Sequence, residues 1–291
     1  SNVYAAQLYG LSAVGTMAHS FIESYDSELE AFRHFAKSRP HDCIFLVDTY
    51  DTLNTGIPNA ITVAREMEKA GHKAAGIRLD SGDLAYLARI ARNMLNEAGL
   101  DYMQIVVSNQ LDEFVIKSLK EQQAPIDVFG VGTRLATGQP DAALDGVYKL
   151  SMAADKPRLK ISESLEKITL PGIKQIRRIF DKNGMFYGAD AIVLSDEEQP
   201  NRMVHPFNAE KFLDLKNLPQ QPLLQKLMSG GKRLSTTRSL QDIAGYVQDR
   251  LALLPREYKR FDNPHIYKVG ISRELMNLRD RLRHEHQRLE E

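Results

Sequence analysis

The chain has 291 residues, with 38 Lys and Arg against 38 Asp and Glu, so its formal net charge is zero. This length accommodates one large barrel-type domain or two smaller domains. A neutral chain does not suit a protein that coats nucleic acid or an anionic membrane, because such binding depends on a clustered excess of Lys and Arg. We therefore predict local phosphate sites, with no nucleic acid and no membrane as partner.

The single cysteine, Cys43, cannot form an internal disulfide, and it stands in the apolar run Cys-Ile-Phe-Leu-Val. This setting is typical of a buried thiol in a reducing compartment, so we expect a cytoplasmic protein. No apolar run approaches the roughly 20 residues that span a bilayer.

Between residues 13 and 135 a short apolar run, a polar or glycine-rich tip and an amphipathic stretch follow one another repeatedly. This pattern predicts parallel strands alternating with helices, and Ser81 is a candidate cap for one helix. The repetition is typical of a doubly wound sheet or an α/β barrel, and in a barrel the carboxyl ends of the strands form the active-site rim. The expected strands are residues 13–19, 43–48, 74–80, 104–109 and 126–133.

After Gly146 short alternating runs separated by turn residues predict antiparallel strands. We expect three regions: an α/β part over residues 1–150, a β-rich appendage over 151–200 and a helical C-terminal region over 201–291. The expected helices of the last region lie near residues 222–228, 239–253 and 272–289.

Each expected parallel strand ends in residues of a kind that bind phosphate or take part in catalysis. Loop tips are polar in most proteins, so one tip alone carries little information, but five successive tips favour a functional edge. The residues concerned are His19, Asp48, Thr49, Arg78, Asp80, Ser108, Asn109, Gly130, Gly132 and Thr133.

The segment 78–83, Arg-Leu-Asp-Ser-Gly-Asp, is the most informative local motif. Alternation along a strand puts Arg78 and Asp80 on one side, Gly82 lets a ligand approach the backbone, and a helix start favours an anion. The two carboxylates, those of Asp80 and Asp83, could hold Mg²⁺ together with substrate phosphate oxygens. The alternative is a capped helix with a structural Arg–Asp pair.

Three further features have a functional and a structural interpretation. Gly130-Val-Gly-Thr133 is similar to a phosphate loop, but tight turns also require glycines. His19 could be a base or a phosphate acceptor, or a hydrogen-bonded structural residue; metal binding is disfavoured because no second His or Cys stands at ligand spacing. Three lysines could supply charge to a phosphate or be solvated: Lys149, Lys160 and Lys167.

Seven motifs occur in order along the chain: Gly15-Thr-Met-Ala-His-Ser20, Leu46-Val-Asp-Thr-Tyr50, Gly76-Ile-Arg-Leu-Asp-Ser-Gly-Asp-Leu84, Val107-Ser-Asn109, Gly130-Val-Gly-Thr133, Gly146-Val-Tyr-Lys-Leu150, and Thr169-Leu-Pro-Gly172 followed by Lys174-Gln175. Together they resemble the motifs of the nicotinate phosphoribosyltransferase family. The agreement of several motifs in order makes this resemblance more specific than any one of them.

The resemblance implies a type II phosphoribosyltransferase fold, an irregular α/β barrel with a small β-rich appendage and C-terminal helices, assembled as a homodimer. It implies that nicotinate and 5-phosphoribosyl 1-diphosphate give nicotinate mononucleotide and diphosphate, coupled to ATP hydrolysis, with Mg²⁺ as cofactor. The chain would correspond to the C-terminal, barrel-containing portion, with the family's N-terminal domain absent. A nicotinamide-using relative and a non-catalytic fragment or subunit are the alternatives.

The resemblance also assigns roles to residues. His19 would be phosphorylated from ATP, and Thr16 and Arg78 would contact nicotinate. Asp80 would be catalytic near the ribose and, with Asp48, would hold the metal. The residues implied for phosphoribosyl diphosphate binding are Ser81, Gly82, Asp83, Ser108, Asn109, Gly130, Gly132, Thr133 and Lys149.

Overall fold

The computed structural model describes residues 3–143, 146–162 and 168–287. The chain divides into two compact units, Ser1–Asp145 and Gly146–Glu291. Among the described residues, no helix has both the length and the apolar character needed to cross a membrane.

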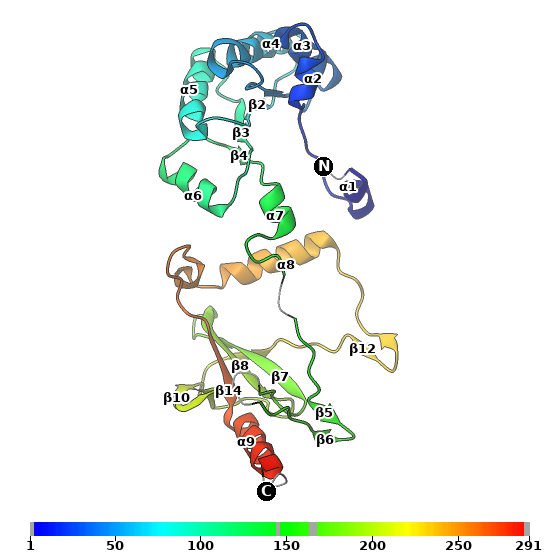
Figure 1. The fold of residues 1–291 in the computed structure, drawn as a ribbon, viewed down its shortest axis with the longest axis vertical. Coiled ribbons are helices and arrows are strands. Elements are labelled where there is room, and N and C mark those ends of the chain that lie inside the picture. The colour runs from blue at the N-terminus through cyan, green and yellow to red at the C-terminus, as the bar shows by residue number, and fades with distance from the viewer. Residues whose placement is uncertain (1–2, 144–145, 163–167, 288–291) are drawn as a thin grey trace. The chain divides into compact units, whose positions relative to one another are not determined.

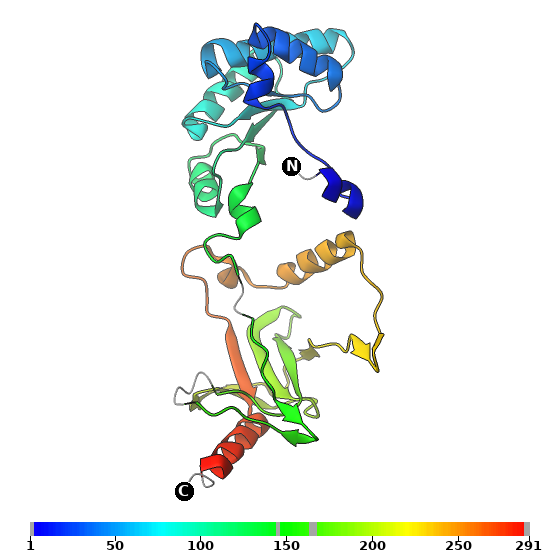
Figure 2. The same ribbon diagram turned by 45° about the vertical axis from the view of Figure 1, so that its right-hand side comes forward.

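The first unit is built on a parallel four-stranded sheet in the order β1-β2-β3-β4. Ile77 on β2 pairs with Phe45 on β1 and with Ile105 on β3, which fixes the register at the centre. Helices α3, α4 and α5 gather on one side of these strands (Figures 1 and 2). The elements of this unit are α1 (Val3–Tyr9), α2 (His19–Glu23), α3 (Glu28–Ser38), β1 (Ile44–Leu46), the π-helical turn η1 (Thr52–Gly56), α4 (Ile57–Lys69), β2 (Gly76–Leu79), α5 (Leu84–Glu97), β3 (Gln104–Val107), α6 (Glu113–Glu121), β4 (Val128–Phe129) and α7 (Thr133–Thr137).

The core of this unit joins the sheet to apolar stripes of the helices. Phe45, Ile77 and Ile105 are fully buried in the strands, and Val63 on α4 and Ala88 on α5 belong to the same cluster. Each large apolar side chain buried in this way contributes about 1.5–3 kcal/mol. The strong helical and strand periodicities in the sequence reflect this packing, so the expected α/β alternation is confirmed.

The strand expected over residues 13–19 is not formed. Residues 11–18 have no regular structure, and His19 begins α2 instead of ending a strand. In this run of small residues Met17 is buried whereas Val14 is 80% exposed. The run therefore buries too little apolar surface to be held as a strand. The other four strands of the first unit are present but shorter than expected, and closure of the sheet into a barrel stays a prediction.

Gly56 is the point of closest approach between the turn η1 and the end of β1. A Cβ atom on Gly56 would lie 1.8 Å from the carbonyl oxygen of Val47. We therefore expect Gly56→Ala to cost about 3 kcal/mol of unfolding free energy, because the backbone must shift to relieve the clash. Thermal unfolding measures the loss. Gly15→Ala, where the added Cβ meets no atom within 4 Å, is the matched control, and an equal Tm for both variants would contradict the expectation.

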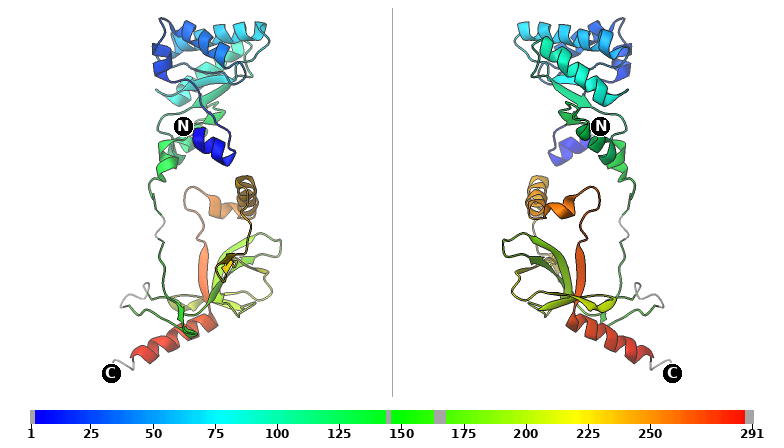
Figure 3. Two further views of the ribbon diagram at one scale, coloured as in Figure 1. Left: turned by 90° about the vertical axis from the view of Figure 1, so that its right-hand side faces the viewer. Right: turned by 90° about the vertical axis from the view of Figure 1, so that its left-hand side faces the viewer.

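The second unit contains a mixed six-stranded sheet in the order β10-β9-β14-β8-β7-β11. The last strand, β14, pairs in parallel with β8 and antiparallel with β9, and α9 continues from it (Figure 3). The elements are β5 (Met152–Ala153), β6 (Lys156–Pro157), β7 (Lys174–Phe180), β8 (Phe186–Leu194), β9 (Arg202–His205), β10 (Asn208–Asp214), β11 (Gln220–Pro222), β12 (Met228–Ser229), β13 (Lys232–Arg233), α8 (Leu240–Ala252), the 3₁₀ turn η3 (Arg256–Lys259), β14 (Lys268–Ser272) and α9 (Arg273–Gln287).

The second unit differs from the expected division at residue 200. Its sheet takes β7 and β8 from the region expected to be a β-rich appendage and β9, β10, β11 and β14 from the region expected to be helical. The helix expected over 222–228 is wrong, because the backbone N–H of Leu223 donates to Ile176 O at 2.9 Å and the chain runs along β7. The helices expected near 239–253 and 272–289 are confirmed as α8 and α9.

Candidate active site

The carboxyl ends of β1, β2 and β3 bring polar side chains from distant parts of the first unit to one place. Parallel strands end at the same edge of a sheet, so residues that follow them become neighbours. His19, from the start of α2, joins this edge through a hydrogen bond from or to Thr49, which follows β1: His19 Nδ1 and Thr49 Oγ1 are 3.0 Å apart. The sequence marked Thr49 as a strand-tip residue but did not indicate this partnership.

Arg78 lies at the centre of the cluster, with its side chain only 21% exposed. Its Nε donates to Ser108 Oγ at 3.1 Å, and its Nη1 donates to Thr16 Oγ1 at 2.5 Å and to Met17 O at 3.2 Å. These bonds hold the guanidinium plane in a fixed orientation, which favours recognition of a planar anion. The structure therefore brings together Thr16 and Arg78, the two residues expected to contact one ligand.

Asp80 completes the charged cluster. Its Oδ1 accepts a hydrogen bond from Ser108 Oγ at 2.5 Å, and its Oδ2 lies 3.5 Å from Arg78 Nη2 and 3.7 Å from His19 Nε2. One carboxylate is thus shared by a guanidinium, an imidazole and a hydroxyl from three different elements. Such a group can stabilise positive charge that develops nearby during a reaction.

Asp48 organises the backbone after β2 instead of pointing to open solvent. Its Oδ2 accepts from the backbone N–H of Asp80 at 2.8 Å and from Ser81 Oγ at 2.6 Å. Ser81 was expected to cap α5, but Asp83 is the cap: its Oδ1 accepts from the N–H of Tyr86 at 3.0 Å. Because α5 begins at Leu84, Asp83 holds the N-cap position, whereas Ser81 lies two residues before it and donates its hydroxyl to Asp48.

The glycines of the site shape its backbone. Gly82 has φ +76°, a conformation that L side chains rarely adopt, so the turn between Asp80 and α5 depends on it. Gly130, after β4, donates its N–H to Val107 O at 2.8 Å, and a Cβ there would lie 3.4 Å from Ser108 Cβ. The loop expected to bind phosphate thus begins beside Ser108. Gly132 and Thr133 in this loop are exposed, as is Asn109, which follows Ser108 after β3.

Two of the three candidate lysines belong to the described part of the second unit. Lys149 and Lys160 are exposed, and Lys167 lies outside the described residues. Their predicted contribution to phosphate binding stays a prediction.

Asp48 and Asp80 were expected to bind a metal. Both oxygens of Asp80 face protein groups, and Asp48 Oδ1 is buried without a hydrogen-bond partner. In the described part of the chain, no group of three or more His, Cys, Asp or Glu side chains could hold a metal ion. These residues do not form a preorganised metal cage, but they fit Mg²⁺ that is bound largely by substrate phosphate oxygens.

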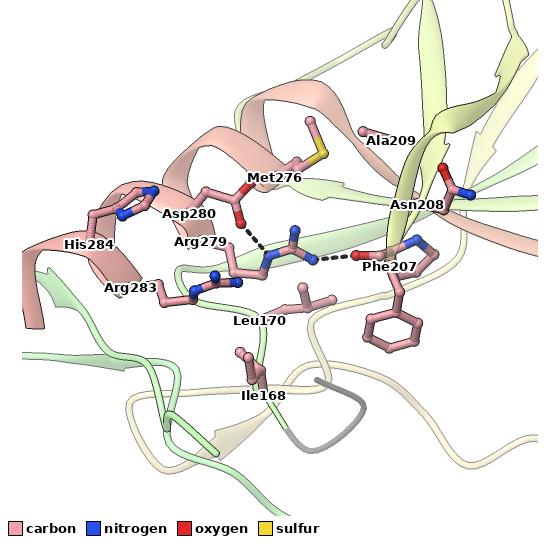
Figure 4. A pocket seen from close by; sticks show the side chains of 11 residues that line it. Ile168, Leu170, Phe207, Asn208, Ala209, Met276, Arg279, Asp280, Arg283 and His284 are labelled. Carbon is pink, nitrogen blue, oxygen red and sulfur yellow. Dashed lines mark hydrogen bonds and ion pairs between the residues drawn. The ribbon is translucent and has the colours of Figure 1, made fainter. Parts of the chain in front are cut away.

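A separate pocket lies within the second unit (Figure 4). It has a volume of about 510 Å³ and is lined by residues that include Leu170, Phe207, Arg279 and Arg283. Arg279 already donates to Asp280 Oδ1 at 2.9 Å and to Pro206 O at 2.6 Å, so its charge is matched within the protein. None of the residues predicted to act on substrate lines this pocket, and we do not assign the chemistry to it.

A parallel α/β sheet with a charged, glycine-flanked carboxyl edge defines a class of protein that binds small ligands at that edge. Residues 1–199 match the nicotinate phosphoribosyltransferase (NAPRTase) family, and residues 173–279 match the nicotinate phosphoribosyltransferase C-terminal domain. The chain therefore belongs to the nicotinate phosphoribosyltransferase family.

Individual relatives agree with this assignment. The chain is 40% identical to nicotinate phosphoribosyltransferase of Bacillus subtilis, over 100% of this chain and 61% of that protein. It is 33% identical to the enzyme of the same name from Dictyostelium discoideum, over 95% of this chain and 56% of that protein. The chain thus spans less than two thirds of the length of these curated relatives.

Solved structures support the α/β fold class. The crystal structure of human nicotinic acid phosphoribosyltransferase is similar with a TM-score of 0.80 and 27% identity, over 97% of this chain and 64% of that chain. Nicotinate-nucleotide pyrophosphorylase from Pyrococcus furiosus has a TM-score of 0.62 and 25% identity, over 86% of this chain and 57% of that chain.

Proposed function

We propose that this chain carries out the reaction of its family, in which nicotinate and 5-phosphoribosyl 1-diphosphate give nicotinate mononucleotide and diphosphate. The observation that supports this most strongly is the Arg78 guanidinium, oriented by Thr16 and Ser108 and placed beside Asp80. A charge-assisted pair between Arg78 and the pyridine carboxylate would orient the ring for reaction.

Phosphoribosyl transfer to nicotinate depends mainly on positioning of the substrates and on electrostatic stabilisation of the transition state. The ring nitrogen of nicotinate attacks C1 of the ribose, a C–N bond forms, and the C–O bond to the diphosphate breaks with its electron pair leaving on the diphosphate. Positive charge develops on the sugar as the leaving group departs, and the Asp80 carboxylate would stabilise it. The backbone N–H groups near Gly82, Gly130 and Gly132 would bind phosphate oxygens, with Asn109 and Thr133 adding side-chain donors.

Coupling to ATP is part of the proposal and is assigned to His19. If Nδ1 carries the proton and donates to Thr49, Nε2 presents its lone pair toward solvent and Asp80. Attack of Nε2 on the γ-phosphorus of ATP forms an N–P bond and releases ADP. Phosphate transfer to water then regenerates the imidazole.

Three further features are carried over from the family as parts of the same proposal. Mg²⁺ would accompany the diphosphate and neutralise its charge on departure, with Asp80 and Asp48 nearby. The working form would be a homodimer in the cytoplasm, with Lys149 assisting phosphate binding. Light scattering of the purified protein measures the oligomeric state.

We expect nicotinate to exceed nicotinamide as a substrate by at least about tenfold in kcat/KM. The amide lacks the negative charge that the Arg78 guanidinium would pair with, and a lost charge-assisted bond costs at least about 1.4 kcal/mol. Turnover of the two substrates under saturating 5-phosphoribosyl 1-diphosphate measures the ratio. A preference for nicotinamide would support the nicotinamide-using alternative.

A non-catalytic portion of a larger enzyme is the second candidate, because the chain spans only 61% of the Bacillus subtilis relative. It predicts a folded protein that neither turns over nicotinate nor accepts phosphate from ATP. Finding both results in a sample with intact secondary structure by circular dichroism would favour this candidate over the enzyme.

A further inference from the structure

Glu28 is a charged residue type in an unusual place, at the start of α3 and only 5% exposed. Its Oε2 accepts a hydrogen bond from Asn59 Nδ2 on α4 at 2.9 Å, while its Oε1 is buried without a hydrogen-bond partner. Glu30, two residues later, is exposed and lies 3.8 Å from His34. Burying a carboxyl costs free energy, so a buried Glu28 indicates that its contacts have a role in the protein.

The contacts of Glu28 connect it to the backbone that carries residues of the candidate active site. Asn59 is on α4, which continues directly from the turn η1, and Gly56 at the end of η1 lies against Val47 at the end of β1. The next residue, Asp48, holds the Asp80 N–H and the Ser81 hydroxyl through Oδ2. Asp48 Oδ1 is buried without a partner, so nothing else on the described chain fixes this carboxylate by a hydrogen bond at that oxygen.

The buried position of Glu28 also affects its pKa. Burial raises the pKa of Glu28, the hydrogen bond from the Asn59 side chain opposes the rise, and the charge of Asp48 adds to it. Glutamine is close to glutamate in shape and keeps a side-chain oxygen that can accept from Asn59.

We propose that Glu28 is a positioning residue that fixes the β1–α4 connection, residues 47–56, and through Asp48 holds the Asp80–Ser81 backbone in its site geometry. Glu28 touches no reacting group; it acts through Asn59, which anchors the start of α4 and so the connection that carries Asp48. Its effect on phosphoribosyl transfer rests on the proposed function, but its effect on the backbone does not.

The test compares hydrogen exchange at the Asp80 amide in the full chain with Glu28→Met and Glu28→Gln. Methionine matches the size of glutamate but leaves the Asn59 amide without its acceptor, at a cost of about 1–3 kcal/mol that is partly offset because no carboxyl is buried. We expect Glu28→Met to stay folded with a Tm lower by a few degrees and to speed exchange at Asp80 at least about tenfold, because the hydrogen bond of this amide opens more easily. Glu28→Gln is expected to stay within about twofold of the parent, since it keeps the acceptor for Asn59.

The control is Glu30→Met, which removes an exposed acid from the same helix and should leave the Asp80 amide unchanged. Unchanged exchange at Asp80 in folded Glu28→Met, or equal acceleration in Glu28→Gln and Glu28→Met, would overturn the inference. If Glu28→Met unfolds, exchange at the Asp80 amide is compared in Glu28→Gln and Asn59→Ala. The inference expects faster exchange in Asn59→Ala only.

Kinetics separates this inference from the proposed function. In an active enzyme the KM for 5-phosphoribosyl 1-diphosphate should rise at least about fivefold in Glu28→Met, with a smaller change in the KM for nicotinate, because Ser81 and Gly82 move and Arg78 does not. Accelerated exchange in a protein without turnover would sustain the positioning role and contradict the proposed function. Turnover with unchanged exchange would contradict the positioning role alone.

Discussion

Replacing Arg78 with glutamine is expected to lower kcat/KM for nicotinate by at least about 100-fold. Removing one partner of a largely buried charge pair costs about 3–5 kcal/mol, because the other charge is left unpaired. Here Asp80 would lose its guanidinium, and the Thr16 and Ser108 hydroxyls would lose their common donor. Steady-state kinetics with nicotinate and nicotinamide measures the effect, and the preference for nicotinate should fall together with its kcat/KM.

The matched control is Arg89→Gln on α5, an exposed arginine that donates to Gln122 O at 3.2 Å and belongs to no part of the site. Its kcat/KM should stay within about twofold of the parent. An unchanged preference for nicotinate in folded Arg78→Gln would show that another group binds the carboxylate.

The part of the site that the sequence predicted is the part that lies on regular parallel strands. Alternation along β2 places Arg78 and Asp80, the residue after the strand, on the same side. Apolar runs in the sequence predict the neighbouring strands β1 and β3. Once these strands are aligned in parallel, the polar residues at their ends must become neighbours. This argument needs only the period of a strand and the rule that parallel strands end together.

The parts that the sequence did not predict depend on contacts between distant segments. Ser81 and Asp83 are both good caps by residue type; the structure starts α5 at Leu84, so Asp83 caps it and Ser81 instead binds Asp48, 33 residues earlier in the chain. Glu28 follows Ser27, a helix cap, and so resembles an ordinary exposed acid in a first turn. Its burial arises where α3 packs against α4 and Asn59 donates to it, a contact between distant segments that no local pattern in the sequence encodes.

If His19 accepts a phosphoryl group, as proposed, hydrogen bonding favours Nε2 as the nitrogen that reacts. Nδ1 lies 3.0 Å from Thr49 Oγ1, whereas Nε2 has Asp80 Oδ2 at 3.7 Å, beyond the range of a good hydrogen bond. The His19 side chain is 39% exposed, so it is not enclosed by the protein. A phosphoryl group there would add negative charge beside Arg78 and Asp80 and change the affinity of the site for an anionic substrate.

We accordingly expect His19→Asn to abolish ATP stimulation of turnover and acid-labile phosphate on the protein, and to leave slow ATP-independent turnover. Asparagine keeps a polar group near Thr49 but has no nitrogen that can accept a phosphoryl group, so coupling is lost while Tm changes by only a few degrees. Radiolabel transfer from γ-labelled ATP and turnover with and without ATP measure the two effects. His34→Asn, an exposed histidine stacked on Tyr25 in the same unit, is the control and should retain both. Undiminished labelling of His19→Asn would move the phosphate acceptor to another residue, whereas lost labelling with undiminished ATP stimulation would separate coupling from the phosphohistidine.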